Sequence, residues 1–142
     1  MMMNPDQPRD WALVSAPSLA DFETMARVAF AALPEDFRAL TGDIGFRIAE
    51  FPDDDVIEDM DLESEFDILG LFHGVGLAHD SEVAETGRMP NMIWLYRRPI
   101  LDYWAEHEET LGAIVSHVLI HEIGHHFGLS DDDMEELEAV AD

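Results

Sequence analysis

Two histidines and a glutamate near the C-terminal end of the sequence have the spacing of a metal site. His121 and His125 are four residues apart, so on a helix both imidazoles project from the same face, one turn apart. That spacing lets two ring nitrogens reach one Zn²⁺ ion at about 2.0–2.1 Å each. Glu122 follows the first histidine and is offset enough to address a metal-bound water rather than the metal. The pattern therefore predicts a metal site with a carboxylate placed for chemistry.

A third metal ligand is predicted shortly after this segment. Gly128 comes three residues after His125 and allows the chain to reverse sharply, which would carry Asp131 back toward the metal as an oxygen ligand. Two imidazoles and one carboxylate leave a fourth position open for water, as in catalytic zinc sites. A chain of this composition contains the two histidines, the glutamate and the glycine at this spacing by chance only about 0.002 times. We therefore favour metal binding over a buried helix with incidental histidines.

The composition restricts the other chemistry that is available. The chain has 142 residues with no cysteine and no lysine, and its seven basic residues are all arginine. Disulfides, cysteine zinc sites, thiol nucleophiles, Schiff-base lysines and a P-loop lysine are thus excluded. The 32 acidic residues give a formal net charge of −25, which would repel nucleic acids and anionic membranes. The longest uncharged apolar stretch, 111–120, is too short to span a bilayer. We expect a soluble, cytoplasmic protein with neither kind of partner.

The hydrophobic pattern predicts one small α+β domain over residues 1–142, of which 1–17 form an irregular lead-in. Ser18 is a candidate helix cap, with Asp21 in the first turn. The acidic segment 52–66 lacks the spacing of an EF-hand calcium loop and is interpreted as a solvated loop, like segment 78–90. Gly128 is expected to end the helix that carries the histidines. Helices are predicted at 19–33, 34–40, 100–107, 109–127 and 131–141, and strands at 44–51, 68–77 and 92–97.

Several other residues have two interpretations. His117 lies one turn before His121 and is a candidate substitute ligand, although we favour His121 and His125 as the two histidine ligands. His126 points about 100° away from His125 and is expected beside the site or in the core. Met134 is expected to pack in the core, and Tyr96 to have a buried ring rather than to donate to an oxyanion. The remaining histidines, His73, His79 and His107, are expected at the surface.

The segment Leu95-Tyr96-Arg97-Arg98-Pro99, followed by His-Glu-Ile-Gly-His-His-Phe-Gly-Leu-Ser-Asp at 121–131, resembles a family of small bacterial metallopeptidases with a minimal zincin fold. The resemblance begins at about residue 18 and is most specific at 95–99 and 121–134. It implies a small mixed sheet packed against the motif helix and an N-terminal helix. It also implies an edge strand at Leu69–Leu77 that binds extended peptide. The site that it implies is zinc held by His121, His125 and Asp131, with Glu122 as general base.

The sequence departs from the larger metzincins in two ways. Asp131 stands where metzincins have a third histidine, and metzincins have a methionine turn well downstream of that ligand. Only eleven residues follow Asp131.

Two other functions are compatible with the same residues. One is a non-catalytic, metal-stabilised peptide-binding or regulatory module, because a chain this short leaves little material for a second lobe over the site. The other is zinc-dependent hydrolysis of a compound that is not a peptide.

Overall fold

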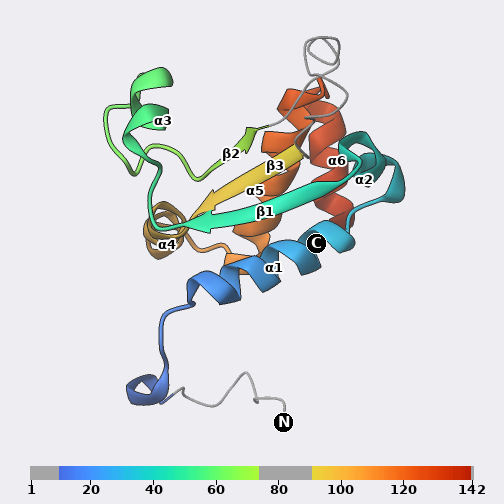
Figure 1. The fold of residues 1–142 in the computed structure, drawn as a ribbon. Coiled ribbons are helices and arrows are strands. Elements are labelled where there is room, and N and C mark those ends of the chain that lie inside the picture. Colours follow the sequence, from blue (N-terminus) through green and yellow to red (C-terminus); the bar gives the residue numbers. More distant parts are fainter. Residues whose placement is uncertain (1–9, 74–90, 142) are drawn as a thin grey trace.

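The computed structural model describes residues 10–73 and 91–141. Over these ranges a small sheet is packed against helices, with the motif helix behind the strands and an N-terminal helix crossing below them (Figure 1). The elements in chain order are a 3₁₀ turn η1 (Trp11–Leu13), α1 (Leu19–Ala31), α2 (Glu35–Thr41), β1 (Ile44–Ala49), α3 (Asp54–Asp59), β2 (Gly70–His73), β3 (Asn91–Tyr96), α4 (Arg97–Glu106), α5 (Leu111–His126) and α6 (Asp131–Ala141).

The sheet is mixed, with the strand order β1-β3-β2. β1 runs parallel to β3, with Phe46 opposite Ile93, and β2 runs antiparallel to β3, with Phe72 opposite the same Ile93. Both α1 and α5 contact the sheet and each other. The predicted α+β fold, a small mixed sheet against the motif helix and an N-terminal helix, is confirmed.

Local sequence signals account for α1. The Ser18 hydroxyl accepts a hydrogen bond from the Asp21 N–H at 3.0 Å, and the Asp21 carboxylate accepts one from the Ser18 N–H at 2.8 Å. This capping box satisfies two N–H groups that the first turn leaves without helical partners. Phe22 and Ala26 of α1 are completely buried. The predicted helix is confirmed, although it ends at Ala31 rather than Leu33.

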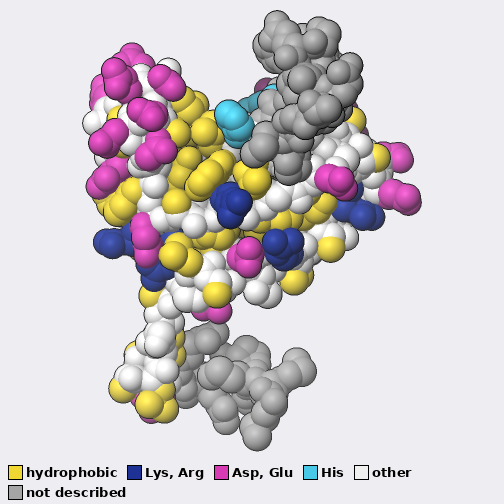
Figure 2. Space-filling view, viewed as in Figure 1, with side chains coloured by type: hydrophobic (Ala, Val, Ile, Leu, Met, Phe, Trp, Pro, Cys, Tyr) yellow, Lys and Arg dark blue, Asp and Glu magenta, His cyan; other side chains and the backbone are white. Residues whose placement is uncertain are grey.

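The acidic segment 52–66 is not simply a loop, because it contains α3. Asp53 caps this helix by accepting a hydrogen bond from the Val56 N–H at 3.0 Å, and Asp54 and Asp55 occupy its first turn. Negative charge at a helix N-terminus is stabilised by the helix dipole. The run of aspartates that suggested a solvated loop thus starts a helix, and its acidic side chains crowd that end of the molecule (Figure 2).

The remaining elements follow their predicted positions with shifts at the ends. α4 begins at Arg97, two residues before Pro99, because proline is tolerated in the first turn of a helix. β2 covers Gly70–His73 of the predicted strand 68–77. Residues 74–77 of that strand, the predicted loop 78–90 and His79 lie outside the described residues.

The core is formed by one side of α5 with α1 and the sheet. Ile120, just before the motif, and Ile123, within it, are fully buried, as are Ile93 and Leu95 of β3. The helix that carries the histidine motif is therefore held by the centre of the hydrophobic core. No helix in the described parts of the chain has the length and apolarity to cross a membrane.

Candidate metal centre

Polar groups define both ends of the motif helix α5. At its start, the Thr110 hydroxyl accepts a hydrogen bond from the Ala113 N–H at 3.1 Å. At its end, Gly128 adopts a φ of 77°, a left-handed conformation that favours glycine. Its N–H donates to the His125 carbonyl at 3.2 Å, and the Leu129 N–H donates to the Gly124 carbonyl at 2.9 Å. The predicted chain reversal at Gly128 is confirmed.

This reversal brings α6 back against the motif helix. Met134 is fully buried and lies over Gly124, where an added Cβ would be 2.6 Å from the methionine Sδ. The core position predicted for Met134 is confirmed, and the absence of a side chain at Gly124 is what permits the contact. Close packing of α6 on α5 determines which acidic side chains come near the histidines.

His117, His121 and His125 form a row along α5. The ring of His121 is stacked on that of His117, with centroids 4.0 Å apart, and meets that of His125 edge to face, with centroids 5.7 Å apart. His121 is therefore the central member, in contact with a histidine on either side. The motif spacing does place His121 and His125 on one face of a helix, as predicted.

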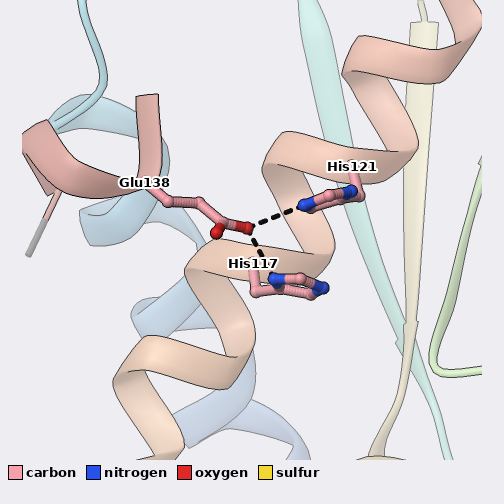
Figure 3. A group of neighbouring side chains, drawn as sticks. All are labelled: His117, His121 and Glu138. Atoms are coloured by element: carbon pink, nitrogen blue, oxygen red, sulfur yellow. Dashed lines mark hydrogen bonds and ion pairs between the residues drawn. The ribbon is translucent and has the colours of Figure 1, made fainter. Parts of the chain in front are cut away.

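A carboxylate from α6 joins the first two histidines of this row. Glu138 Oε1 lies 2.5 Å from His117 Nδ1 and 2.7 Å from His121 Nε2. Figure 3 shows the Glu138 carboxylate directed between the two rings. These three residues offer ligand atoms that all lie within 4.8 Å of one another. Among the described residues, no other group of three metal-binding side chains has its ligand atoms this close together.

Asp131 is not part of that group. It is the first residue of α6 and is exposed, in the turn capped by the Ser130 hydroxyl, which accepts a hydrogen bond from the Asp133 N–H at 3.1 Å. The ligand set of His121, His125 and Asp131 stays a prediction.

Glu122 lies on the side of α5 that faces the sheet. Burial raises the pKa of its carboxyl group, and this effect exceeds the lowering caused by His125 and by a hydrogen bond from the Phe72 backbone N–H. Tyr96 has a buried ring, as predicted, and burial, reinforced by the charges of Asp53 and Glu122, raises its pKa to about 12. A partly buried carboxylate thus stands between the histidine row and strand β2.

The other histidines lie apart from this row. His126 is exposed, and its ring packs on Phe72 with centroids 4.4 Å apart, so it covers the sheet beside the site. His73 is exposed at the end of β2. His107 is exposed too, and its ring is stacked on Tyr103 with centroids 3.8 Å apart. The surface positions predicted for His73 and His107 are confirmed.

A comparison with models of protein families agrees with the metal-binding motif on α5. The model of a family described as zincin-like metallopeptidase matches residues 41–140. This chain belongs to that family. The match includes the sheet, the motif helix and α6 up to residue 140. A comparison with curated proteins found no match.

The donor set of this zincin-like protein suits the zinc that its family implies. Imidazole and carboxylate are common zinc ligands, and the chain has no cysteine that would compete for the ion. Two imidazoles bound to one tetrahedral ion have ring centroids roughly 5 Å apart, close to the 5.7 Å between His121 and His125. The chemistry of these side chains therefore fits a zinc ion.

Glu138 is the residue near this site that the sequence interpretation missed. A signal for it exists, because Glu138 follows Met134 by four residues and so lies on the same side of α6. If Met134 is taken as a core residue that faces α5, Glu138 must come near α5 as well. His117 was considered as a ligand, and the structure places it in the row with His121.

Proposed function

We propose that this zincin-like protein is a zinc-dependent peptidase, in which Glu122 is the general base and an extended peptide binds along β2. The observation that carries the proposal is the position of Glu122. Its carboxylate is partly buried, follows the first motif histidine, and accepts a hydrogen bond from the edge strand. The proposed base therefore lies between the motif histidine His125 and the edge strand.

The proposed ligands are His121 and His125 from α5, with Asp131 as the third. We call this set the motif position. When bound there, zinc would polarise a substrate carbonyl and lower the pKa of a coordinated water to about 7. His125 is exposed and His121 is partly buried, so the position is open to solvent and substrate.

Glu122 is suited to receive and return a proton. Because burial raises the pKa of its carboxyl group, Glu122 is a stronger base than an exposed glutamate and a better match to neutral pH. In the proposed reaction it takes a proton from the attacking water and passes it to the leaving amide nitrogen. The hydrogen bond from Phe72 restricts the orientation of the carboxylate while this happens.

The outer edge of β2 is a candidate peptide-binding strand. Within the described residues no strand pairs with that edge. The Tyr96 N–H donates to the Leu69 carbonyl at 3.0 Å, so the alternation of an antiparallel ladder directs the backbone groups of Gly70 and Phe72 away from β3. A peptide added as a further strand would bind to the outward groups of Gly70 and to the Phe72 carbonyl, beside Glu122, to which the Phe72 N–H donates.

A hollow on the face of the sheet opposite to α5 offers room for a substrate side chain. It has a volume of about 190 Å³. Leu71 and His73 point into it from β2, on the face opposite to Phe72. Asp53 in its lining and the net charge of −25 favour a substrate with positive charge. Its other lining residues are Ala49, Phe51, Val56, Trp94 and Tyr96.

The proposal is tested by cleavage of a peptide library, with products identified by mass spectrometry. Zinc-loaded protein should cleave peptides, and a chelator should abolish the cleavage. Glu122→Gln should lower the rate by about 10²–10⁴-fold while zinc binding persists. The matched control is Glu135→Gln, an exposed position on α6, which should keep full activity. Full activity of Glu122→Gln would refute the proposal, whereas bound zinc without any cleavage by the unaltered protein would favour a binding module.

A further inference from the structure

We infer that His117, His121 and Glu138 form a second binding position for a divalent transition-metal ion, distinct from the motif position. We call it the upstream position, because it lies one helical turn before the motif pair and shares His121 with it. The observation behind it is the convergence of two imidazole nitrogens on one carboxylate oxygen, at 2.5 and 2.7 Å.

The geometry of the upstream position suits a metal ion after a small adjustment. Two ligand atoms on a tetrahedral zinc ion are about 3.3 Å apart, whereas the nitrogen-to-oxygen distances here are shorter by less than 1 Å. The Glu138 side chain has three rotatable bonds before its carboxylate and can retract by that amount. The two rings, stacked at 4.0 Å, need to open by about 1 Å.

The chemistry and the surroundings also favour a cation. Two imidazoles with one carboxylate form a ligand set of known zinc sites and leave a fourth position for water. The His117 side chain is 51% exposed, so an ion can reach it from solvent. α6 also has an acidic first turn, Asp131–Asp133, and negative charge on a surface raises the local concentration of cations.

The shared histidine links the two positions. His121 Nε2 is directed to Glu138, and a nitrogen lone pair binds one metal ion. An ion at the upstream position that uses this nitrogen leaves only His125 and Asp131 at the motif position. The upstream position would thus hold the ion away from Glu122. This inference does not require that Glu122 is catalytic or that the protein cleaves peptides.

A variant that removes only the motif position isolates the upstream one. Metal-free His125→Ala protein is titrated with Co²⁺, and the visible absorption of the bound ion is recorded. We expect one bound Co²⁺ per chain. Adding Glu138→Gln should weaken binding at least about tenfold, whereas adding the control Glu135→Gln should not. Equal affinity of His125→Ala with and without Glu138→Gln would overturn the inference.

An NMR measurement tests the same point without a second substitution. In His125→Ala protein labelled with ¹⁵N, zinc should shift the imidazole resonances of His117 Nδ1 and His121 Nε2 to values of metal-bound nitrogen. If zinc leaves the His117 ring unshifted, the three residues are only a hydrogen-bonded clamp between α5 and α6. Neither measurement uses a peptide, so failure here is distinguishable from failure of the proposed peptidase activity.

Discussion

The Glu122 carboxylate on the motif helix accepts a hydrogen bond from the backbone N–H of Phe72 on the edge strand β2. This contact joins the two elements that the proposed peptidase activity needs, a base beside the proposed metal ligands and a strand that binds substrate. It depends on β2 lying closely on α5 at Gly70, where an added Cβ would be 2.6 Å from the Val118 side chain. The position of the proposed base is therefore a product of core packing.

Glu122→Gln is expected to stabilise metal-free protein at neutral pH. Burial raises the pKa of Glu122, so the folded protein binds this proton more tightly than the unfolded chain does. The group contributes stability at acid pH that is lost as the pH rises through the raised pKa. Glutamine removes the buried charge and keeps an oxygen that can accept from Phe72. Thermal unfolding should show a higher Tm for the variant at pH 7, by a few degrees.

The pH dependence of this difference supplies its check. The gain in Tm should shrink as the pH is lowered, because the wild-type carboxyl group is then protonated in the folded state. Glu135→Gln, an exposed substitution on α6, should leave Tm nearly unchanged. A lower Tm for Glu122→Gln at pH 7 would show that its burial does not penalise the charge.

Tyr96 should make the protein sensitive to alkali. Its pKa is raised to about 12 from an ordinary value near 10, so the unfolded chain ionises first as the pH rises. Its contribution to stability is complete below about pH 10 and is lost between about pH 10 and 12. Urea unfolding over this range should show a loss of up to about 2 kcal/mol more in the wild type than in Tyr96→Phe. The partly exposed Tyr103 gives the control Tyr103→Phe, which should retain the wild-type dependence, and an identical loss in Tyr96→Phe would contradict the assignment.

Substitution of two glycines of the motif helix by alanine should have opposite effects on the free energy of unfolding. At Gly124 an added Cβ would be 2.6 Å from the Sδ of buried Met134, whereas at Gly112 it would meet nothing within 4 Å. We expect Gly124→Ala to lower the free energy of unfolding by about 1–3 kcal/mol through overpacking. Gly112→Ala should raise it by up to about 1 kcal/mol, because alanine favours helix. Urea denaturation measures both, and similar effects of the two substitutions would argue against close packing of α6 on the motif.

The turn after the motif should require glycine at position 128 because of its backbone conformation, and not because a side chain would clash. Gly128 has a φ of 77° with open space around it, so a side chain there is strained but does not clash. Gly128→Ala should cost about 1–2 kcal/mol of stability. Gly128→Asn should cost less, since asparagine tolerates the left-handed region. Equal losses for alanine and asparagine in urea unfolding would point to a cause other than φ.

The sequence was most informative where local signals and burial agree. The helix cap at Ser18, the apolar side of α5 and the glycine at 128 each determine structure through neighbouring residues, and each was predicted. The aspartates at 53–55 have two local interpretations, because they suit both a solvated loop and a helix N-terminus. The structure shows the second.

The site was less predictable because its residues come from different elements. His121, Glu122 and His125 share one helix, so their spacing alone predicts a common location. Glu138 reaches the histidines only because Met134 packs α6 against Gly124 of α5. This packing joins two different helices, so local sequence signals do not predict it. The contact between Glu122 and Phe72 depends on how β2 crosses α5, which hydrophobic periodicity does not specify.

The central claim is that His121 holds a divalent metal ion, and the metal content of the protein tests it most directly. Protein loaded with zinc is dialysed against a weak chelator that removes adventitious ions, and zinc is measured per chain. We predict one zinc ion in the wild type, the same in the control His107→Ala, and little or none in His121→Ala, since His121 belongs to both the motif and the upstream position. No zinc in the wild type, or an equal amount in His121→Ala, would contradict the account.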